Sequence, residues 1–125
     1  MHENEIARSV IGAAIAVHKN LGPGLLESTY EAALAYDLRI LGFDVKQQHP
    51  LPFKYKEVRL SMGFRVDLLI NKKVIIEIKS VEALAPVHFA QLLTYLRLSD
   101  LRLGLLFNFN VLLLKEAIHR VVNRL

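Results

Sequence analysis

Residues 64–80 read FRVDLLINKKVIIEIKS, two apolar runs joined at residues 71–73 and interrupted by only a few charges. Successive side chains of a β-strand point to opposite faces, so alternation predicts where these charges lie. The apolar faces are formed by Val66, Leu68 and Ile70 in the first run and by Val74, Ile76 and Ile78 in the second. Asp67, Glu77 and Lys79 fall on the reverse faces. Since buried unpaired charges are costly, charges within strands this apolar point to a specific role.

One register brings both apolar faces to a single core. It pairs Ile70 with Val74, Leu68 with Ile76 and Asp67 with Glu77, leaving a loop of residues 71–73. A slip by one residue would turn the charges of one strand into the core, so the pattern disfavours it. The register therefore predicts Asp67 beside Glu77, with Lys79 one pleat further along.

Two adjacent carboxylates repel each other unless a cation or a proton lies between them. Mg²⁺ is held by one or two carboxylates together with waters and substrate phosphates, so it suits Asp67 and Glu77. The neighbouring Lys79 would stabilise developing charge, or orient or deprotonate a water molecule. The alternative for the same three residues is a solvated sheet face, and spacing alone leaves that alternative open.

The remaining sequence predicts helices on both sides of these strands. Helices are expected over residues 4–20, from about 26 or 28 to 41, over 85–98 and over 115–123, and further strands over 43–48, 53–55, 57–61 and 103–109. This order indicates an α/β fold, bordering on α+β, with a mixed β-sheet flanked by helices. A crossover through the third helix predicts that the strands at 74–79 and 103–109 are parallel.

Length and composition limit the classes to which the chain can belong. With 125 residues we expect a single domain over 1–125, and no apolar stretch is long enough to span a bilayer. The chain has no cysteine and no signal-peptide pattern at its start, which predicts a cytoplasmic protein. The net charge of +4 permits contact with phosphates without requiring it. Basic residues cluster only at 54–59 and 72–73, so no dedicated nucleic-acid arm is predicted.

Between the first two helices, Gly24, Glu27 and Tyr30 form a G-x-x-E-x-x-Y pattern. With the blocks AVHKNLGPGLLESTYEAAL, FRVDLLI, VIIEIKS, LAPVHFAQLLTYL and LGLLFNFN, the chain resembles the GxxExxY family of the PD-(D/E)XK nuclease superfamily over nearly its whole length. The resemblance implies a restriction-endonuclease-like core. The chain departs from the superfamily pattern at Val66, the position directly before Asp67, where other members often have a proline. This difference removes no metal ligand.

The resemblance also implies roles for individual residues. Catalytic roles fall to Asp67, Glu77, Lys79, Glu27, Gln91 and Tyr95, and metal binding to Asp67, Glu77, Glu27 and the backbone carbonyl of Ile78. The implied ion is Mg²⁺, with Mn²⁺ as a substitute. Outside the resemblance, Glu27 would equally serve as a helix cap.

Three residues are predicted to contact substrate. Arg65 lies two residues before Asp67 on its face, where it would meet a phosphate or pair with a carboxylate. His88 lies one turn before Gln91, with plain surface exposure as the alternative, and Tyr30 belongs to the G-x-x-E-x-x-Y pattern.

These observations predict a Mg²⁺-dependent nuclease that hydrolyses phosphodiester bonds in DNA, in preference to RNA. The first alternative is a nuclease-fold module that binds nucleic acid or a partner with little or no turnover. The second is a structural ion network, and a homodimer is left open because residues 103–109 and 111–114 are apolar.

Overall fold

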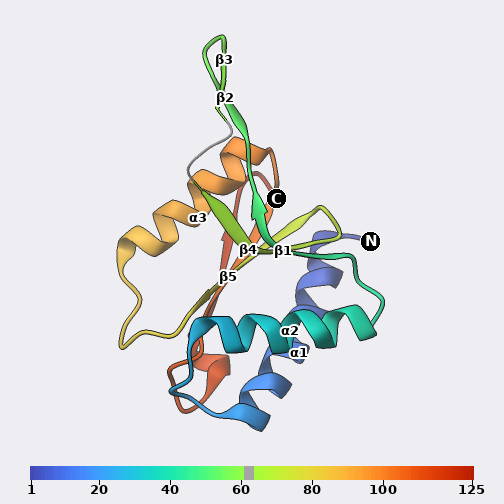
Figure 1. The fold of residues 1–125 in the computed structure, drawn as a ribbon, viewed down its shortest axis with the longest axis vertical. Coiled ribbons are helices and arrows are strands. Elements are labelled where there is room, and N and C mark those ends of the chain that lie inside the picture. The colour runs from blue at the N-terminus through green and yellow to red at the C-terminus, as the bar shows by residue number, and fades with distance from the viewer. Residues whose placement is uncertain (61–63) are drawn as a thin grey trace.

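The computed structural model describes residues 1–60 and 64–125. The elements in chain order are α1 (Glu3–Leu21), α2 (Glu27–Ile40), β1 (Val45–Pro50), β2 (Phe53–Tyr55), β3 (Val58–Leu60), β4 (Arg65–Ile70), β5 (Val74–Lys79), α3 (Pro86–Ser99), β6 (Leu103–Asn108), a short 3₁₀ turn (Leu114–Ala117) and β7 (Ile118–Val122). The arrangement confirms the predicted mixed sheet flanked by helices (Figure 1).

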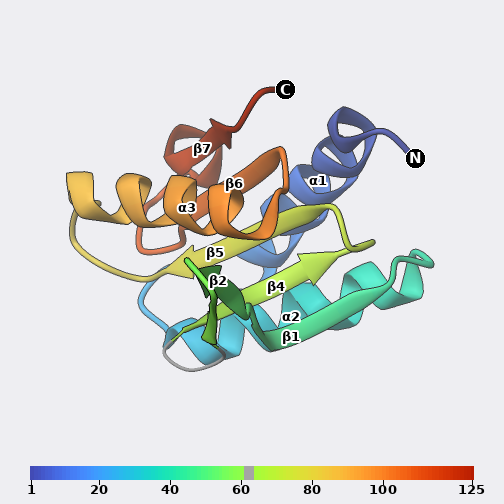
Figure 2. The same cartoon turned by 90° about the horizontal axis from the view of Figure 1, so that it is seen from above.

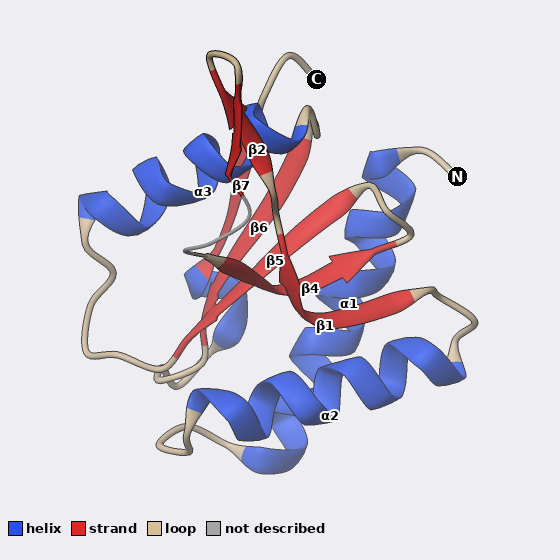
Figure 3. Cartoon of the chain, turned by 45° about the horizontal axis from the view of Figure 1, so that its top comes forward, coloured by secondary structure: helices blue, strands red, loops and turns tan. Residues whose placement is uncertain are grey.

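The main sheet has the strand order β1-β4-β5-β6-β7. Neighbouring strands are antiparallel except β5 and β6, which run parallel as the crossover through α3 predicts. The pairs Ile70–Val74 and Leu68–Ile76 between β4 and β5 are also confirmed. Helices α1 and α2 cover one face of this sheet and α3 covers the other (Figures 2 and 3).

Because both faces are covered, the sheet has two apolar cores, where the sequence predicted one. Leu68 and Ile76 pack toward α1 and α2, whereas Leu69 and Ile75 pack toward α3. Val66 was predicted to share a face with Leu68, but it lies in the core under α3. The alternation therefore breaks at the intervening residue, Asp67.

The break has a counterpart on the neighbouring strand. Pairing between β1 and β4 runs from Val45–Ile70 to Pro50–Arg65 but omits Gln48, which stands opposite Asp67 and has a φ of +48°. A positive φ is uncommon for a residue other than glycine, so it is not readable from a hydrophobic pattern. This local distortion directs the Asp67 side chain toward the end of β5.

The C-terminal segment differs from the prediction. A helix was expected over 115–123, but the chain forms the 3₁₀ turn and then β7, which pairs antiparallel with β6. The β-branched residues Ile118, Val121 and Val122 favour a strand, and pairing covers the otherwise open edge of β6. The contribution of 103–109 to self-association, left open by the sequence, does not fit the structure, because this segment is buried.

The predicted hairpin at 53–61 is present as β2 and β3, a two-stranded unit separate from the main sheet. Its last predicted residue, Ser61, lies outside the described residues. The hairpin projects from the body of the molecule (Figure 1). No helix within the described parts of the chain is long and apolar enough to cross a membrane.

Candidate active site

Asp67 and Glu77 lie side by side where β4 and β5 separate. The paired register ends at Leu68–Ile76, so the predicted backbone pair Asp67–Glu77 is not formed. Instead each carboxylate accepts a hydrogen bond from the other strand. The Ile78 amide donates to Asp67 Oδ2 at 2.7 Å, and the Asp67 amide donates to Glu77 Oε2 at 3.1 Å. These reciprocal bonds hold both side chains at the point where backbone pairing stops.

The Glu77 carboxylate is buried, with 6% of the residue exposed. Burial raises its pKa to about 8, and the negative charge and side-chain hydrogen bond of Asp67 act in the same direction. The nearby ammonium of Lys79 lowers the pKa, but less than burial raises it. At neutral pH, two carboxylates in this arrangement require a shared proton or a cation.

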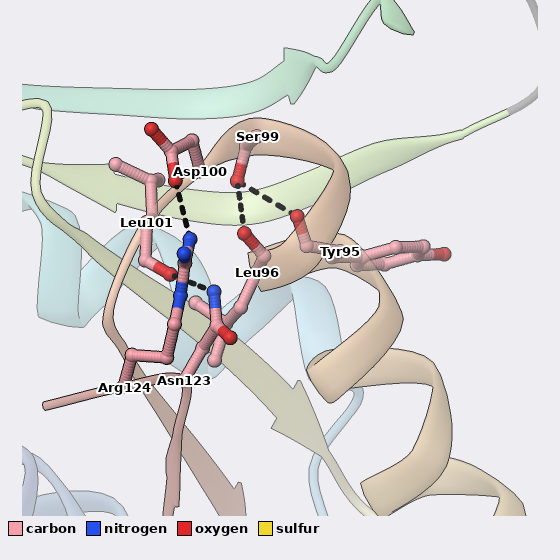
Figure 4. Close-up of polar contacts among 7 residues, drawn as sticks. All are labelled: Tyr95, Leu96, Ser99, Asp100, Leu101, Asn123 and Arg124. Atoms are coloured by element: carbon pink, nitrogen blue, oxygen red, sulfur yellow. Dashed lines mark hydrogen bonds and ion pairs between the residues drawn. The ribbon is translucent and has the colours of Figure 1, made fainter. Parts of the chain in front are cut away.

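Tyr95 approaches the two carboxylates from α3, the helix that covers one face of the sheet. The pKa of its phenol is raised by burial and then by the charges of Glu77 and Asp67, which puts the ring within their electrostatic reach. Figure 4 shows the ring pointing away from the end of α3, where Ser99 Oγ donates to the Tyr95 carbonyl at 2.7 Å. The ring stacks on Phe64 with centroids 4.5 Å apart. Gln91 lies one turn earlier on the same helix and is exposed.

Glu27 begins α2 and ties this helix to the end of β5. Its Oε2 accepts a hydrogen bond of 3.0 Å from the Ser80 amide, one residue beyond Lys79. Simple helix capping does not describe this contact, because Glu27 bonds a residue 53 positions away. Because the Glu27 carboxylate is bound to the Ser80 amide beyond the end of β5, the structure does not bring it into the pair formed by Asp67 and Glu77.

Tyr30 holds the turn before α2 in place. Its hydroxyl donates to the Gly22 carbonyl at 2.6 Å and accepts from the Leu25 amide at 3.1 Å, while its ring stacks on Phe109. The residue is completely buried. The prediction that Tyr30 contacts substrate does not fit this position, because no part of the side chain reaches the surface.

Two residues at the site escaped the sequence analysis. Gln48 Nε2 donates to Asp67 Oδ1 at 3.2 Å and also to the carboxylate of Glu31 on α2. Glu31 lies four residues after Glu27, hence on the same helical face, and this spacing was the one available signal. Gln48 gave no signal, because its position depends on the distortion of β1.

The other predicted substrate contacts have local partners. Arg65 is exposed, and its guanidinium donates to the Gln48 carbonyl at 3.1 Å, so its partner in the structure is a backbone oxygen. His88 Nδ1 accepts from the Ala85 amide at 3.0 Å and thereby caps the start of α3.

The chemistry of the carboxylate pair fits a hard divalent cation. Its donors are oxygens, one carboxylate is buried, and their mutual repulsion is of the kind that a bound cation relieves. Within residues 1–60 and 64–125, however, no group of three or more His, Asp or Glu side chains is placed to hold a metal ion. The side chains alone therefore offer two ligands, Asp67 and Glu77.

Comparison with known proteins agrees with this geometry. A family model described as the PD-(D/E)XK nuclease superfamily matches residues 4–121. Among the curated proteins and the solved structures, no significant match was found. The match covers almost the entire sequence, including both strands of the carboxylate pair and α3. The chain therefore belongs to the PD-(D/E)XK nuclease superfamily.

Proposed function

We propose that the protein is a Mg²⁺-dependent nuclease, with Mn²⁺ as a substitute, that hydrolyses phosphodiester bonds in DNA in preference to RNA. The observation that carries the proposal is the carboxylate pair: Asp67 and the buried Glu77 lie together at a strand end, with Lys79 beside them. Membership of a nuclease superfamily supports the same chemistry. We expect residues 1–125 to act as one domain, and a cytoplasmic location stays a prediction from the sequence.

In this proposal Asp67, Glu77 and the Ile78 carbonyl bind the ion. The Ile78 amide points toward β4, and the carbonyl of the same residue in an extended strand points the same way, toward Asp67. The bound ion would neutralise charge on the scissile phosphate and lower the pKa of a water molecule. Lys79 would hydrogen-bond and orient that water, while Tyr95 would close the α3 side of the site and Gln91 would line its open part.

We also propose that the chain belongs to the GxxExxY branch of the superfamily. The three residues of this pattern support one turn. Gly24 takes a φ of +91°, the Tyr30 hydroxyl accepts a hydrogen bond from the Leu25 amide in the turn, and Glu27 accepts one from the Ser80 amide. Glu27 thereby positions the strand end that carries Lys79. As a ligand of the ion, the role that the family resemblance implies, Glu27 would have to leave its bond to the Ser80 amide.

The proposal is tested by measuring cleavage of plasmid and linear DNA, and of matched RNA, with and without Mg²⁺. We expect Asp67→Asn and Lys79→Ala to lower the cleavage rate at least a hundredfold, with unchanged circular dichroism. Glu116→Gln is the control, because it changes one exposed carboxylate on the 3₁₀ turn. If both site variants cleave as fast as the parent, the assigned roles are wrong.

One observation favours a second candidate, a nuclease-fold module that binds nucleic acid or a partner with little turnover. Glu27 is engaged by the Ser80 amide, so the described residues provide two carboxylate ligands in place of three. Binding that falls with salt, without cleavage under Mg²⁺ or Mn²⁺, would support this candidate. Light scattering would test the homodimer, for which Leu112 and Leu113 are the exposed apolar residues of the segment 111–114.

A further inference from the structure

The hairpin of β2 and β3 projects from the main sheet (Figure 1) and carries two different faces. Its cross-strand pairs are Phe53–Leu60, Lys54–Arg59 and Tyr55–Val58. Since side chains alternate along a strand, the first and third pairs share the apolar face, and Lys54 and Arg59 share the other. The hairpin is therefore amphipathic, with one basic side.

The basic side has an unfavourable charge arrangement. Lys54 and Arg59 are both exposed and stand directly opposite each other, and like charges in such a pair destabilise a hairpin. Neither is neutralised by a carboxylate: across residues 1–60 and 64–125 the one ion pair is Arg124–Asp100. A multivalent anion between the two cations would remove this repulsion.

The tip adds a third cation and an aromatic ring. Lys56 follows β2, and its ammonium lies 5.4 Å from the centre of the Tyr55 ring, within the range of a cation–π contact. The Tyr55 residue is 59% exposed. Exposed aromatic rings among cations are the combination with which proteins bind nucleic-acid strands.

The base of the hairpin is joined to the candidate active site by stacked rings. Phe53 of β2 lies 5.7 Å from Phe64, and Phe64 lies 4.5 Å from Tyr95 and nearly parallel to it. Tyr95 in turn is within the electrostatic reach of Glu77 and Asp67. The Lys54–Arg59 pair therefore comes directly after the Phe53–Leu60 pair that anchors the hairpin, on the opposite face of the hairpin from the Phe53 ring.

We propose that this hairpin is a substrate arm: Lys54 and Arg59 bind the phosphate backbone of the nucleic acid whose scissile bond lies at the carboxylate pair. The proposal rests on the proposed nuclease function for the identity of its ligand. No such arm was predicted from the sequence: it showed the basic cluster at 54–59 and strands on either side, but not that Lys54 stands directly opposite Arg59.

The test compares two charge-matched double variants. Lys54→Gln/Arg59→Gln removes the basic face, whereas Lys72→Gln/Lys73→Gln removes two exposed lysines from the β4–β5 turn, at the other end of β4. Binding of the parent and both variants to a fluorescent 30-base-pair DNA duplex, to its single strand and to the equivalent RNA is measured in EDTA at several salt concentrations. Without divalent ions, cleavage does not disturb the measurement.

We expect Lys54→Gln/Arg59→Gln to weaken duplex binding about tenfold or more in 100 mM salt. The slope of log K against log salt should become shallower by about 1.8, since each lost phosphate contact accounts for about 0.9. The β4–β5 turn variant should keep the parent slope. Equal slopes for the parent and the hairpin variant, or no measurable binding by the parent, would overturn the proposal. An acidic protein would then be the ligand to test on the basic face of the hairpin.

A second measurement separates this proposal from the proposed nuclease function. Bis(p-nitrophenyl) phosphate is a small phosphodiester that offers no backbone for the arm to bind, so its Mg²⁺-dependent hydrolysis reports the active site alone. We expect both double variants to hydrolyse it at the parent rate. A parent that hydrolyses neither this ester nor nucleic acid would contradict the nuclease function, while the salt slopes would still decide the role of the hairpin.

Discussion

Glu77 is buried beside a second carboxylate, and this single residue sets the electrostatics of the site. Its pKa is about 8, against an ordinary value of 4.5. Between these two pH values, the folded protein without a cation keeps a proton on Glu77 that the unfolded chain releases. The contribution of Glu77 to folding stability is fully present below about pH 4.5. It is lost as the pH rises toward 8, because the charged form is disfavoured in the fold.

At the residue scale we therefore predict a pH dependence that Mg²⁺ removes. In EDTA the free energy of unfolding should fall between pH 5 and 8, by at most about 1.4 kcal/mol per pH unit from this group. Glu77→Gln, which imitates the protonated side chain, should lose that part of the slope, and saturating Mg²⁺ should flatten it in the parent. Urea unfolding at several pH values measures each slope. Identical slopes for the parent and Glu77→Gln would contradict the prediction, and Glu116→Gln is the control.

At the scale of elements, α3 packs on β6 so closely that one position has no room for a methyl group. A Cβ added to Gly104 would lie 2.7 Å from Cδ1 of Leu92, a completely buried residue of α3. Leu92 lies one turn before Tyr95 and Leu96, so any shift of α3 also moves the ring at the active site.

We predict that Gly104→Ala destabilises the protein by about 1–3 kcal/mol through overpacking. Leu92→Ala alone should cost about 2–5 kcal/mol by leaving a cavity. The double variant should cost less than the sum, because the new methyl fills part of that cavity. Chemical denaturation measures all three.

Gly12→Ala is the matched control: it lies inside α1 with nothing within 4 Å of the added Cβ, and it should be neutral or stabilising. Additive costs would show that Gly104 and Leu92 are not coupled.

The elements that the sequence predicted well are those with a strong internal pattern. Alternation in β4 and β5, and Pro86 at the first turn of α3, are local signals, and all three elements were located within a residue or two. The predicted helix at 115–123 failed because β7 depends on a partner, β6, that stands ten residues or more earlier in the chain. Pairing of this kind is tertiary, so propensity alone does not decide it.

At the scale of the whole molecule, the sequence led to the right residues with an incomplete arrangement. It placed Asp67, Glu77 and Lys79 at one site because carboxylates in apolar strands are rare. It predicted a sheet flanked by helices but only one apolar core, so the position of Tyr95 in the second core came from the family resemblance and not from the pattern. It also missed the contribution of Gln48, whose positive φ arises where β1 bends past β4. Contacts that depend on how elements are packed have no signature within any one element.

The last prediction concerns how the sheet is closed at its β7 edge. Strand β6 is buried along its whole length, and β7 is what covers its outer edge. Asn123 then fixes the end of β7 to the α3–β6 connection: its side-chain amide donates to the Leu101 carbonyl (Figure 4), and its backbone amide donates to the Arg102 carbonyl. A chain ending at Ala117 should therefore expose an apolar strand edge and aggregate. A chain ending at Asn123 loses the exposed Arg124–Asp100 ion pair, worth less than about 1 kcal/mol, and Leu125, which is 41% exposed, and it should remain soluble with a similar melting temperature. Size-exclusion chromatography and thermal unfolding measure both, and a monomeric, folded chain ending at Ala117 would show that β7 is dispensable for closing the sheet.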